Sequence, residues 1–268
     1  MAAGLDNIVR RLAMLEADTS PGNLAKHSDP VEFAARLDLD PDGWQRGLLR
    51  SEAPRILLNC SRQSGKSTMA GVVALREALT APGSLTLILA PAERQAKELF
   101  SKIAAFYRVL GSPLPAESYR KLGMNLANGS RIEALPGSEK TIRGFSGVDL
   151  LIVDEAARVA DELYYAVRPM LAVSGGRLLM LSTPFGKRGV FHHEWTEGSG
   201  WERYEVPASR CPRIPPAFLV EERESLGEWW YAQEYECRFM EGVDNVFAHE
   251  LIQAALSSDV APLFGEAG

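Results

Sequence analysis

At 268 residues the chain has room for one large α/β domain, or for such a domain with a small appendage. Apolar residues make up 46% of it and charged residues 24%, values typical of a soluble protein with a sizeable core. The net charge is −6, whereas a freestanding DNA-binding domain is usually basic. Any contact with nucleic acid is therefore expected from a local patch or from one subunit of an assembly.

Residues 1–50 are predicted to be mainly helical, because their apolar positions recur at helical spacing. Charged residues interrupt the apolar residues of segment 1–20, so this segment resembles neither a secretory signal nor a membrane span. The cysteines Cys60, Cys211 and Cys237 are odd in number and show no metal-ligand spacing. This cysteine usage indicates a reducing, cytosolic setting.

A regular alternation of strands and helices follows. Continuous apolar runs predict buried strands at residues 56–60, 85–90, 150–154 and 177–182, with a further strand at 201–206. Helices are expected at residues 66–80, 93–110 and 161–171. The alternation predicts an α/β fold with a mostly parallel central sheet flanked by helices.

Two further segments have their own signals. Residues 124–135 are expected to form a hairpin, with Asn128 and Gly129 supplying the positive φ angles of a tight turn. Residues 217–240 are rich in aromatic residues and glutamate and predict two helices, which would form a small lid. We expect a helical segment at 1–50, the core at 51–210, a lid and linker at 211–250, and a tail at 251–268.

A nucleotide-binding loop is indicated by residues 60–68, which read CSRQSGKST. The phosphate-loop pattern expects glycine at position 60, where this chain has Cys60, but that position only has to turn the chain. Lys66 supplies the charge, and the helix that it opens favours anions at its N-terminus. A chance Gly-Lys-Ser at a helix start is the alternative, and the strand directly before it favours the loop. The expected nucleotide-binding residues here are Ser61, Arg62, Gln63, Ser64, Gly65, Lys66, Ser67 and Thr68.

Two adjacent acids follow the apolar run at 150–153. Asp154 is expected to hold Mg²⁺ together with Ser67, and Glu155 to take a proton from an attacking water. An N-cap aspartate that opens a helix is the alternative reading. The pair lies downstream of a Gly-Lys-Ser loop, which favours ATP hydrolysis.

Polar residues at two other positions could complete the site. Ser182 and Thr183 follow the strand at 177–182, where a side chain could sense the γ-phosphate, although a Ser/Thr turn before proline is the simpler reading. Gln45, after Trp44, could offer both a donor and an acceptor to adenine, and a solvent-facing glutamine is the alternative.

Arginine side chains could stabilise the charge that develops on a transferred phosphoryl group. Arg62 lies within the loop and would act in cis, whereas Arg143 lies on a glycine-flanked loop that could reach a neighbouring subunit. Further candidates are Arg158, Lys187 and Arg188. For any single arginine, a solvated surface charge is the alternative.

Taken in order, these motifs resemble the ATPase domain of large terminase subunits, the DNA-packaging motors of tailed bacteriophages. The matching stretches are WQ at 44–45, SRQSGKS at 61–67, NGSRIEALPG at 128–137, IRG at 142–144, DLLIVDEA at 149–156 and LSTPFGKRG at 181–189. The segments 201–215 and 233–240 also fit the lid and linker of that family. A phosphate loop with an arginine and without the leading glycine is typical of these proteins.

The resemblance implies an ASCE-type P-loop ATPase that uses ATP and Mg²⁺. It assigns Gln45 to adenine, Lys66 and Ser67 to the phosphates and the metal, and Asp154 and Glu155 to the metal shell and the catalytic base. By the same resemblance, Ser182 and Thr183 couple hydrolysis to movement.

The resemblance also implies partners. The expected partners are double-stranded DNA, the portal protein, the small terminase subunit and further copies of this chain in a ring, a pentamer in the assembled motor, with Arg143 reaching a neighbour's ATP. The expected location is the host cytoplasm, transiently at the procapsid portal. Because the sequence stops near where the family's nuclease domain begins, we expect no DNA cleavage by this chain.

Two other functions stay open at this point. A helicase-like or repair ATPase would use the same chemistry but would need a second motor domain. A nucleotide-dependent assembly scaffold would bind nucleotide without hydrolysis, a reading that the intact Lys66, Asp154 and Glu155 disfavour.

Overall fold

The fold is built on a single eight-stranded sheet, in a computed structural model that describes residues 29–136 and 144–241. The strands lie in the order β3-β4-β5-β2-β6-β7-β1-β8. All pairs from β5 to β8 are parallel, and β4 runs against both of its neighbours. The strands are β1 (Arg55–Cys60), β2 (Leu85–Ala90), β3 (Ala116–Arg120), β4 (Gly123–Leu126), β5 (Arg131–Pro136), β6 (Leu150–Asp154), β7 (Arg177–Ser182) and β8 (Glu202–Val206).

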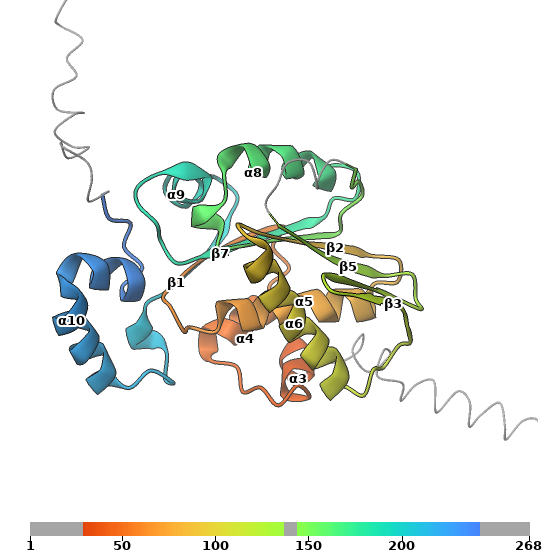
Figure 1. The fold of residues 1–268 in the computed structure, drawn as a ribbon, viewed down its shortest axis with the longest axis horizontal. Helices are drawn as coiled ribbons and strands as arrows, with labels where there is room; N and C mark the ends of the chain where they lie inside the picture. Colours follow the sequence, from red (N-terminus) through yellow and green to blue (C-terminus); the bar gives the residue numbers. More distant parts are fainter. Residues whose placement is uncertain (1–28, 137–143, 242–268) are drawn as a thin grey trace, which may run out of the picture.

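Helices cover both faces of this sheet (Figure 1). One face carries α3 (Pro30–Ala35), α4 (Gly43–Arg50), α5 (Lys66–Thr80) and α6 (Glu93–Val109), and the other carries α8 (Asp161–Val167) and α9 (Gly189–Thr196). Short 3₁₀ helices span Ala156–Arg158, Arg168–Leu171 and Ala208–Arg210. Within the described ranges, no helix is long and apolar enough to cross a bilayer.

Alternation of side chains along each strand divides the core into two layers. In β6, Leu150 and Ile152 belong to the cluster under α3 to α6, whereas Leu151 and Val153 belong to the cluster under α8 and α9. All four side chains are at most 2% exposed. A strand buried on both faces needs an unbroken apolar sequence, so the sequence pattern identified β6 correctly.

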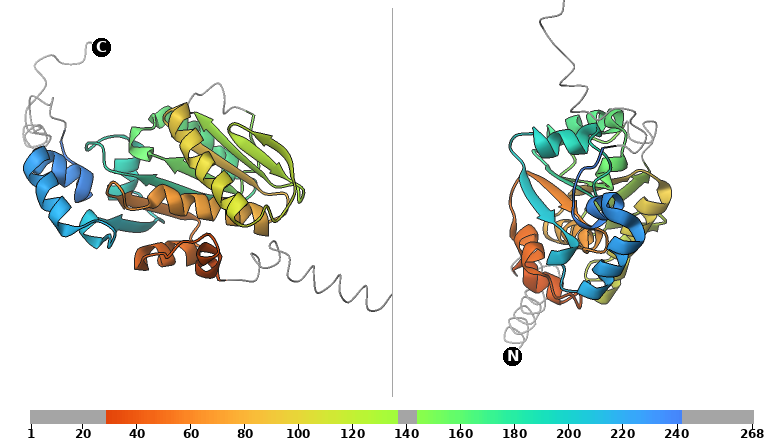
Figure 2. Two further views of the ribbon diagram at one scale, coloured as in Figure 1. Left: turned by 60° about the horizontal axis from the view of Figure 1, so that its bottom comes forward. Right: turned by 90° about the vertical axis from the view of Figure 1, so that its left-hand side faces the viewer.

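The last described helix, α10 (Pro216–Tyr235), lies beyond the end of the sheet and apart from the two main layers (Figure 2). Gly227 interrupts it with φ 73°, a left-handed conformation that glycine adopts at little cost. The two helical stretches on either side of this kink correspond to the two helices expected at 217–240. A small cluster of Ala208, Tyr231 and Tyr235 fixes α10 to the preceding 3₁₀ turn.

Most predicted elements are confirmed, one expectation needs correction, and two elements were not predicted. The hairpin of β4 and β5 exists, but of its two turn residues only Gly129 has a positive φ, at 81°. The Asn128 side chain instead accepts a hydrogen bond from the Ser130 N–H at 3.0 Å. The sequence analysis missed β3 and α9, because β3 is mostly exposed and α9 is short, and neither has a clear apolar period. The expected elements before residue 29 lie outside the described residues.

Close packing at Gly176 provides a test of the sheet. A Cβ atom placed there would lie 2.0 Å from the Val148 carbonyl oxygen, so Gly176→Ala must push apart the segments that precede β6 and β7. We expect a loss of about 1–3 kcal/mol in the free energy of unfolding, measured by urea denaturation. Gly43→Ala is the matched control, because nothing lies within 4 Å of its Cβ position, and it should leave stability unchanged or slightly raised. Equal stability of both variants would contradict the packing described.

Candidate nucleotide site

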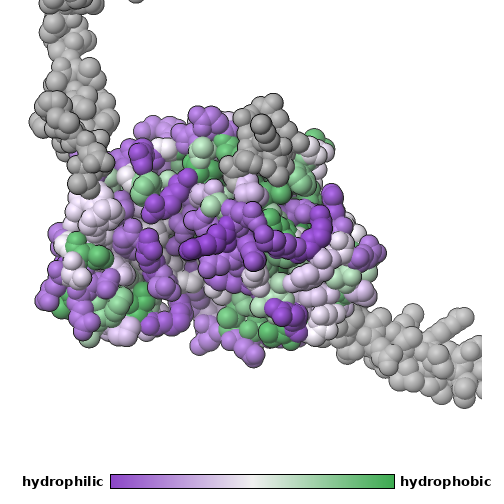
Figure 3. All heavy atoms as spheres, in the orientation of Figure 1, coloured by the Kyte–Doolittle hydropathy of each residue, from purple (hydrophilic) through white to green (hydrophobic). Residues whose placement is uncertain are grey.

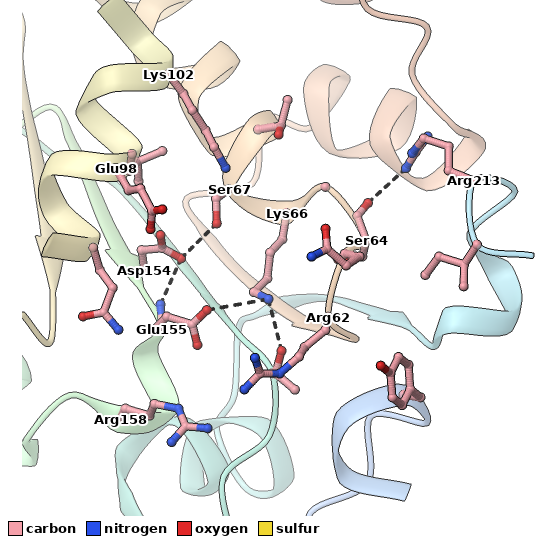
Figure 4. Close-up of a pocket in the computed structure, with 18 of the residues that line it drawn as sticks. Arg62, Ser64, Lys66, Ser67, Glu98, Lys102, Asp154, Glu155, Arg158 and Arg213 are labelled. Carbon is pink, nitrogen blue, oxygen red and sulfur yellow. Dashed lines mark hydrogen bonds and ion pairs between the residues drawn. The ribbon is translucent and has the colours of Figure 1, made fainter. Parts of the chain in front are cut away.

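The topology brings the motif residues together at one edge of the sheet. β7 lies between β1 and β6, and all three strands are parallel. The loop at 60–68, the acids at 154–155 and Thr183 therefore leave the sheet at the same edge, where ligands bind in open parallel α/β sheets. They surround a cavity of about 1180 Å³, lined also by α6 and by the start and end of α10 (Figure 4).

The loop from β1 to α5 has the backbone of a phosphate cradle. Its positive φ angles lie at Gln63 (59°) and Gly65 (89°), whereas Cys60 has an ordinary strand conformation and pairs with Val206 in β8. Cys60 is fully buried in the core, so the structure needs no glycine there. The left-handed backbone at Gly65 favours glycine, and a Cβ atom there would lie 2.9 Å from Nε2 of Gln45, so the Gln45 amide would have to shift.

Lys66 is the cation at the centre of the site. Its ammonium group donates a hydrogen bond to Oγ1 of Thr183 at 3.1 Å and lies 3.7 Å from Oε1 of Glu155 (Figure 4). The residue is only 7% exposed, although it lines the cavity. A buried ammonium needs an anion, and in this structure Glu155 provides it.

Asp154 and Ser67 fit a magnesium ion. The Ser67 hydroxyl donates to Oδ1 of Asp154 at 3.3 Å, which places two oxygen ligands side by side at the mouth of the loop. Burial and, to a smaller extent, the charge of Glu155 raise the pKa of Asp154 to about 6, while the charge of Lys66 opposes this shift. A divalent cation would relieve this repulsion between the two acids. Mg²⁺ typically takes one or two such ligands and fills its shell with phosphates and waters.

No larger metal centre is present in the described part of the chain, where no group of three or more His, Cys, Asp or Glu is placed to hold an ion.

Glu155 occupies an unusual backbone position. Its φ is 51°, in the left-handed region, at the junction of β6 and the 3₁₀ turn that follows. Its N–H donates to Oδ1 of Asp154 at 3.0 Å, which fixes the two carboxylates relative to one another. Non-glycine residues held in this region often belong to functional sites. The Glu155 side chain lines the cavity beside Lys66, where a general base would lie.

Arg62 connects the loop to α10. Its Nε donates to Oε2 of Glu234, and its backbone N–H donates to the Glu234 carbonyl oxygen at 3.0 Å. The hydrogen bond to Glu234 raises the pKa of Arg62. The Arg62 side chain is 59% exposed and lines the cavity, so the guanidinium can leave this carboxylate for another anion.

The remaining predicted residues differ in their placement. Thr183 contacts Lys66, whereas the Ser182 hydroxyl donates to the Thr183 carbonyl oxygen at 2.7 Å and does not line the cavity. Ser61 is likewise buried outside the cavity, while every residue from Arg62 to Thr68 lines it. Arg143 lies outside the described residues.

Gln45 packs behind the loop and does not line the cavity. Its Oε1 accepts from the Asp42 N–H at 2.9 Å in a capping box at the start of α4, and its Nε2 donates to the Ser64 carbonyl oxygen at 3.3 Å. A contact between Gln45 and adenine stays a prediction. It would require the Gln45 amide to give up its hydrogen bonds to Asp42 and Ser64.

Several lining residues were missed. Arg94, Glu98 and Lys102 come from α6 at intervals of four residues, and this spacing could have shown that one face of the helix is charged. Arg213 bridges both oxygens of Asp42 and the Ser64 carbonyl oxygen, at 2.7–3.1 Å. No local sequence signal marks Arg213, because its partners lie about 150 residues away or more.

The chain is similar in sequence and in fold to known proteins. The family model for the N-terminal part of the terminase large subunit, T4-like virus type, matches residues 57–254. The chain belongs to this family. The large terminase subunit of Thermus virus P23-45 is 27% identical over 253 residues, covering 81% of this chain and 52% of the relative. That of Escherichia phage T5 is 25% identical over 217 residues, covering 76% and 49%. The chain thus spans about half the length of these relatives.

Solved terminase structures share the fold. The large terminase ATPase domain of Thermus phage P74-26 matches with a TM-score of 0.70 and 24% identity, over 80% of this chain and all of that domain. The large terminase of the thermophilic bacteriophage D6E, solved with ADP, matches with a TM-score of 0.61 and 11% identity, over 78% and 53%. These likenesses confirm the predicted P-loop α/β fold for this terminase chain.

The acid pair gives a prediction about titration. Because burial and the charge of Glu155 together raise the pKa of Asp154 to about 6, removing that charge in Glu155→Gln should lower it. Replacing Lys66 with methionine removes a neighbouring cation and should raise it. Carbon-13 NMR of the aspartate carboxyls between pH 4 and 8, assigned with Asp154→Asn, measures both shifts. An Asp154 that titrates near 4 in all three proteins would contradict the buried, coupled pair.

Proposed function

We propose that this chain is the ATP-hydrolysing motor domain of a viral terminase and that it moves double-stranded DNA into a procapsid. The observation that carries the proposal is the convergence of Lys66, Ser67, Asp154 and Glu155 on one cavity at the carboxyl edge of the sheet. Membership of the large terminase family supports the packaging role.

The chemistry follows from these four side chains. Lys66 would exchange its contact with Glu155 for the β- and γ-phosphates, while the loop N–H groups and the start of α5 hold the remaining phosphate charge. Mg²⁺, held by Ser67 and Asp154, would supply charge neutralisation at the phosphates. Once released from Lys66, the Glu155 carboxylate is available to orient a water and accept its proton.

Contacts with α10 suggest how hydrolysis is coupled to movement. Arg62 binds Glu234 through side chain and backbone, and the Gly186 N–H, in the loop after β7, donates to Oε1 of Gln233 at 3.3 Å. Both the phosphate loop and the strand end that carries Thr183 therefore contact the same turn of α10. A γ-phosphate that attracts Arg62 and Lys66 would weaken the first contact and let α10 move relative to the sheet.

The partners follow from the family. We propose double-stranded DNA, a portal protein, a small terminase subunit and a ring of copies of this chain as partners, with the host cytoplasm and the portal vertex as the place of action. Because the net charge is −6, we expect DNA to be gripped through a local basic patch or through several subunits of an assembly, in a sequence-blind and salt-sensitive manner. Arg143 is proposed to complete the site of a neighbouring copy.

Replacement of Glu155 tests the chemical step. Glu155→Gln keeps the shape of the side chain but removes the base, so ATP hydrolysis should fall about 10²–10⁴-fold while ATP affinity is largely kept. Steady-state phosphate release and equilibrium ATP binding measure the two quantities. Glu162→Gln, an exposed acid on α8, is the control and should leave both unchanged. Normal turnover in Glu155→Gln would remove it from the role of base.

A mixing experiment tests the proposed ring. Arg143→Ala and Lys66→Ala should each be inactive alone, the first for lack of the trans arginine and the second for lack of phosphate binding. Mixed at concentrations where rings form, they should recover part of the ATPase rate, because some sites then pair an intact Lys66 with a neighbour's intact Arg143. Absence of recovery in rings verified by ultracentrifugation would count against Arg143 acting in trans.

A further inference from the structure

The cavity has two chemically different ends. Around the phosphate loop, its lining is almost entirely charged or polar. Its apolar lining gathers elsewhere: apart from Leu99, the apolar and aromatic residues that line it are Ile214, Pro215, Phe218 and Tyr235. We call these four residues the apolar end. They come from the segment that leads into α10 and from the first and last turns of that helix.

Two aromatic rings dominate the apolar end, and they differ in exposure. The Tyr235 ring is 8% exposed, stacks on Tyr231 with centroids 5.3 Å apart, and its hydroxyl donates to Oε2 of Glu222 at 2.7 Å. Phe218 packs edge-on against Tyr235, with centroids 6.2 Å apart and planes at 76°, and it is 40% exposed. The buried Tyr235 ring thus supports the Phe218 ring, which stays partly exposed and lines the cavity.

Exposed apolar residues on α10 are common, but Phe218 is distinct among them. Val220, Leu226 and Trp230 are also 38–59% exposed, and none of the three lines the cavity. Apolar side chains gather over α10 on the face shown in Figure 3, whereas the centre of that face is hydrophilic. Of these four exposed residues of α10, Phe218 is the one that lines the same cavity as Lys66.

Three polar groups beside the apolar end already have partners. The Arg213 guanidinium is bound to Asp42 and to the Ser64 carbonyl oxygen, and the Gln45 amide bonds Asp42 and Ser64 as well. The Tyr235 hydroxyl is held by Glu222. Reading the edge of a base through these groups would cost existing hydrogen bonds, whereas stacking on a ring would cost none.

We propose that the apolar end binds the base of the nucleotide and that Phe218 stacks on its face. This inference rests on the proposed nucleotide-binding function. A ring face accepts any purine, so the site recognises the presence of a base rather than its hydrogen-bonding edge. ATP and GTP are then bound with similar affinity, and the lid helix α10 contacts the base directly while Glu234 contacts the loop arginine.

The test compares three ligands on the full chain in the presence of Mg²⁺: ATPγS, GTPγS and inorganic tripolyphosphate. In the unmodified protein, the Kd values of ATPγS and GTPγS should agree within about threefold. Phe218→Ala should weaken both about tenfold and leave the Kd of tripolyphosphate unchanged, because only the base contact is lost. Isothermal titration calorimetry measures all values.

Two further variants control the result. Val220→Ala removes an exposed apolar side chain from the same helix outside the cavity and should change nothing. Phe218→Trp keeps a stacking surface and should retain affinity. If Phe218→Ala proves unstable by thermal melting, Phe218→Leu keeps apolar volume without the ring and should show the same ligand-specific loss.

Four outcomes would overturn the inference. Unchanged ATPγS affinity in a folded Phe218→Ala protein removes the stacking role. More than about thirtyfold preference for ATPγS over GTPγS shows that hydrogen bonds read the base edge, as the Gln45 assignment expects. If neither nucleotide nor tripolyphosphate binds the unmodified chain, the nucleotide site itself is wrong, and the base subsite with it; tripolyphosphate binding alone refutes only the base subsite.

Discussion

The structure depends on the placement of one buried ammonium group between three strand ends. Lys66 extends from the start of α5 toward Thr183 at the end of β7 and Glu155 at the end of β6. Such a charge is tolerated in a nearly closed position only if an anion lies beside it. Glu155 is that anion here, and a triphosphate would replace it. The ion pair between Lys66 and Glu155 therefore stabilises the site. It also keeps Glu155, the proposed base, bound to Lys66 until a nucleotide displaces it.

Contacts between α10 and the sheet make this exchange mechanically relevant. The turn of α10 at Gln233 and Glu234 binds both the phosphate loop and the loop after β7, and the Cys237 carbonyl just beyond it accepts a hydrogen bond from the Asn59 side chain at 2.9 Å. In the described part of the chain, the apolar cluster that fixes α10 is small, so these polar contacts also help to hold the helix in place. Polar contacts can be exchanged for phosphate oxygens, whereas apolar packing cannot, so the lid is attached by interactions that a nucleotide can alter.

How much could be predicted from the sequence depends on the range of each interaction. β6 and the loop before α5 have dense local signals, because burial on both faces and phosphate binding both demand residue types in a fixed order. No such requirement restricts the residue types of β3, since this strand lies exposed at the edge of the sheet. Arg213 was missed because its role comes from Asp42 and Ser64, about 150 residues or more away in sequence. The sequence analysis assigned Gln45 to adenine, whereas its hydrogen bonds to Asp42 and Ser64 could be known only from the fold.

The two ends of the cavity divide nucleotide recognition between parts of the fold with different rigidity. The phosphate end is formed by strand ends fixed in a sheet whose central strands are fully buried, so its geometry changes little when α10 moves. Residues of the apolar end belong to α10 and the segment before it, so they would follow any movement of that helix. Under the proposed function, a nucleotide that spans both ends would be fully bound only where α10 brings the two ends to the right separation. Binding of the base would then favour one position of α10, and hydrolysis of the triphosphate would release it.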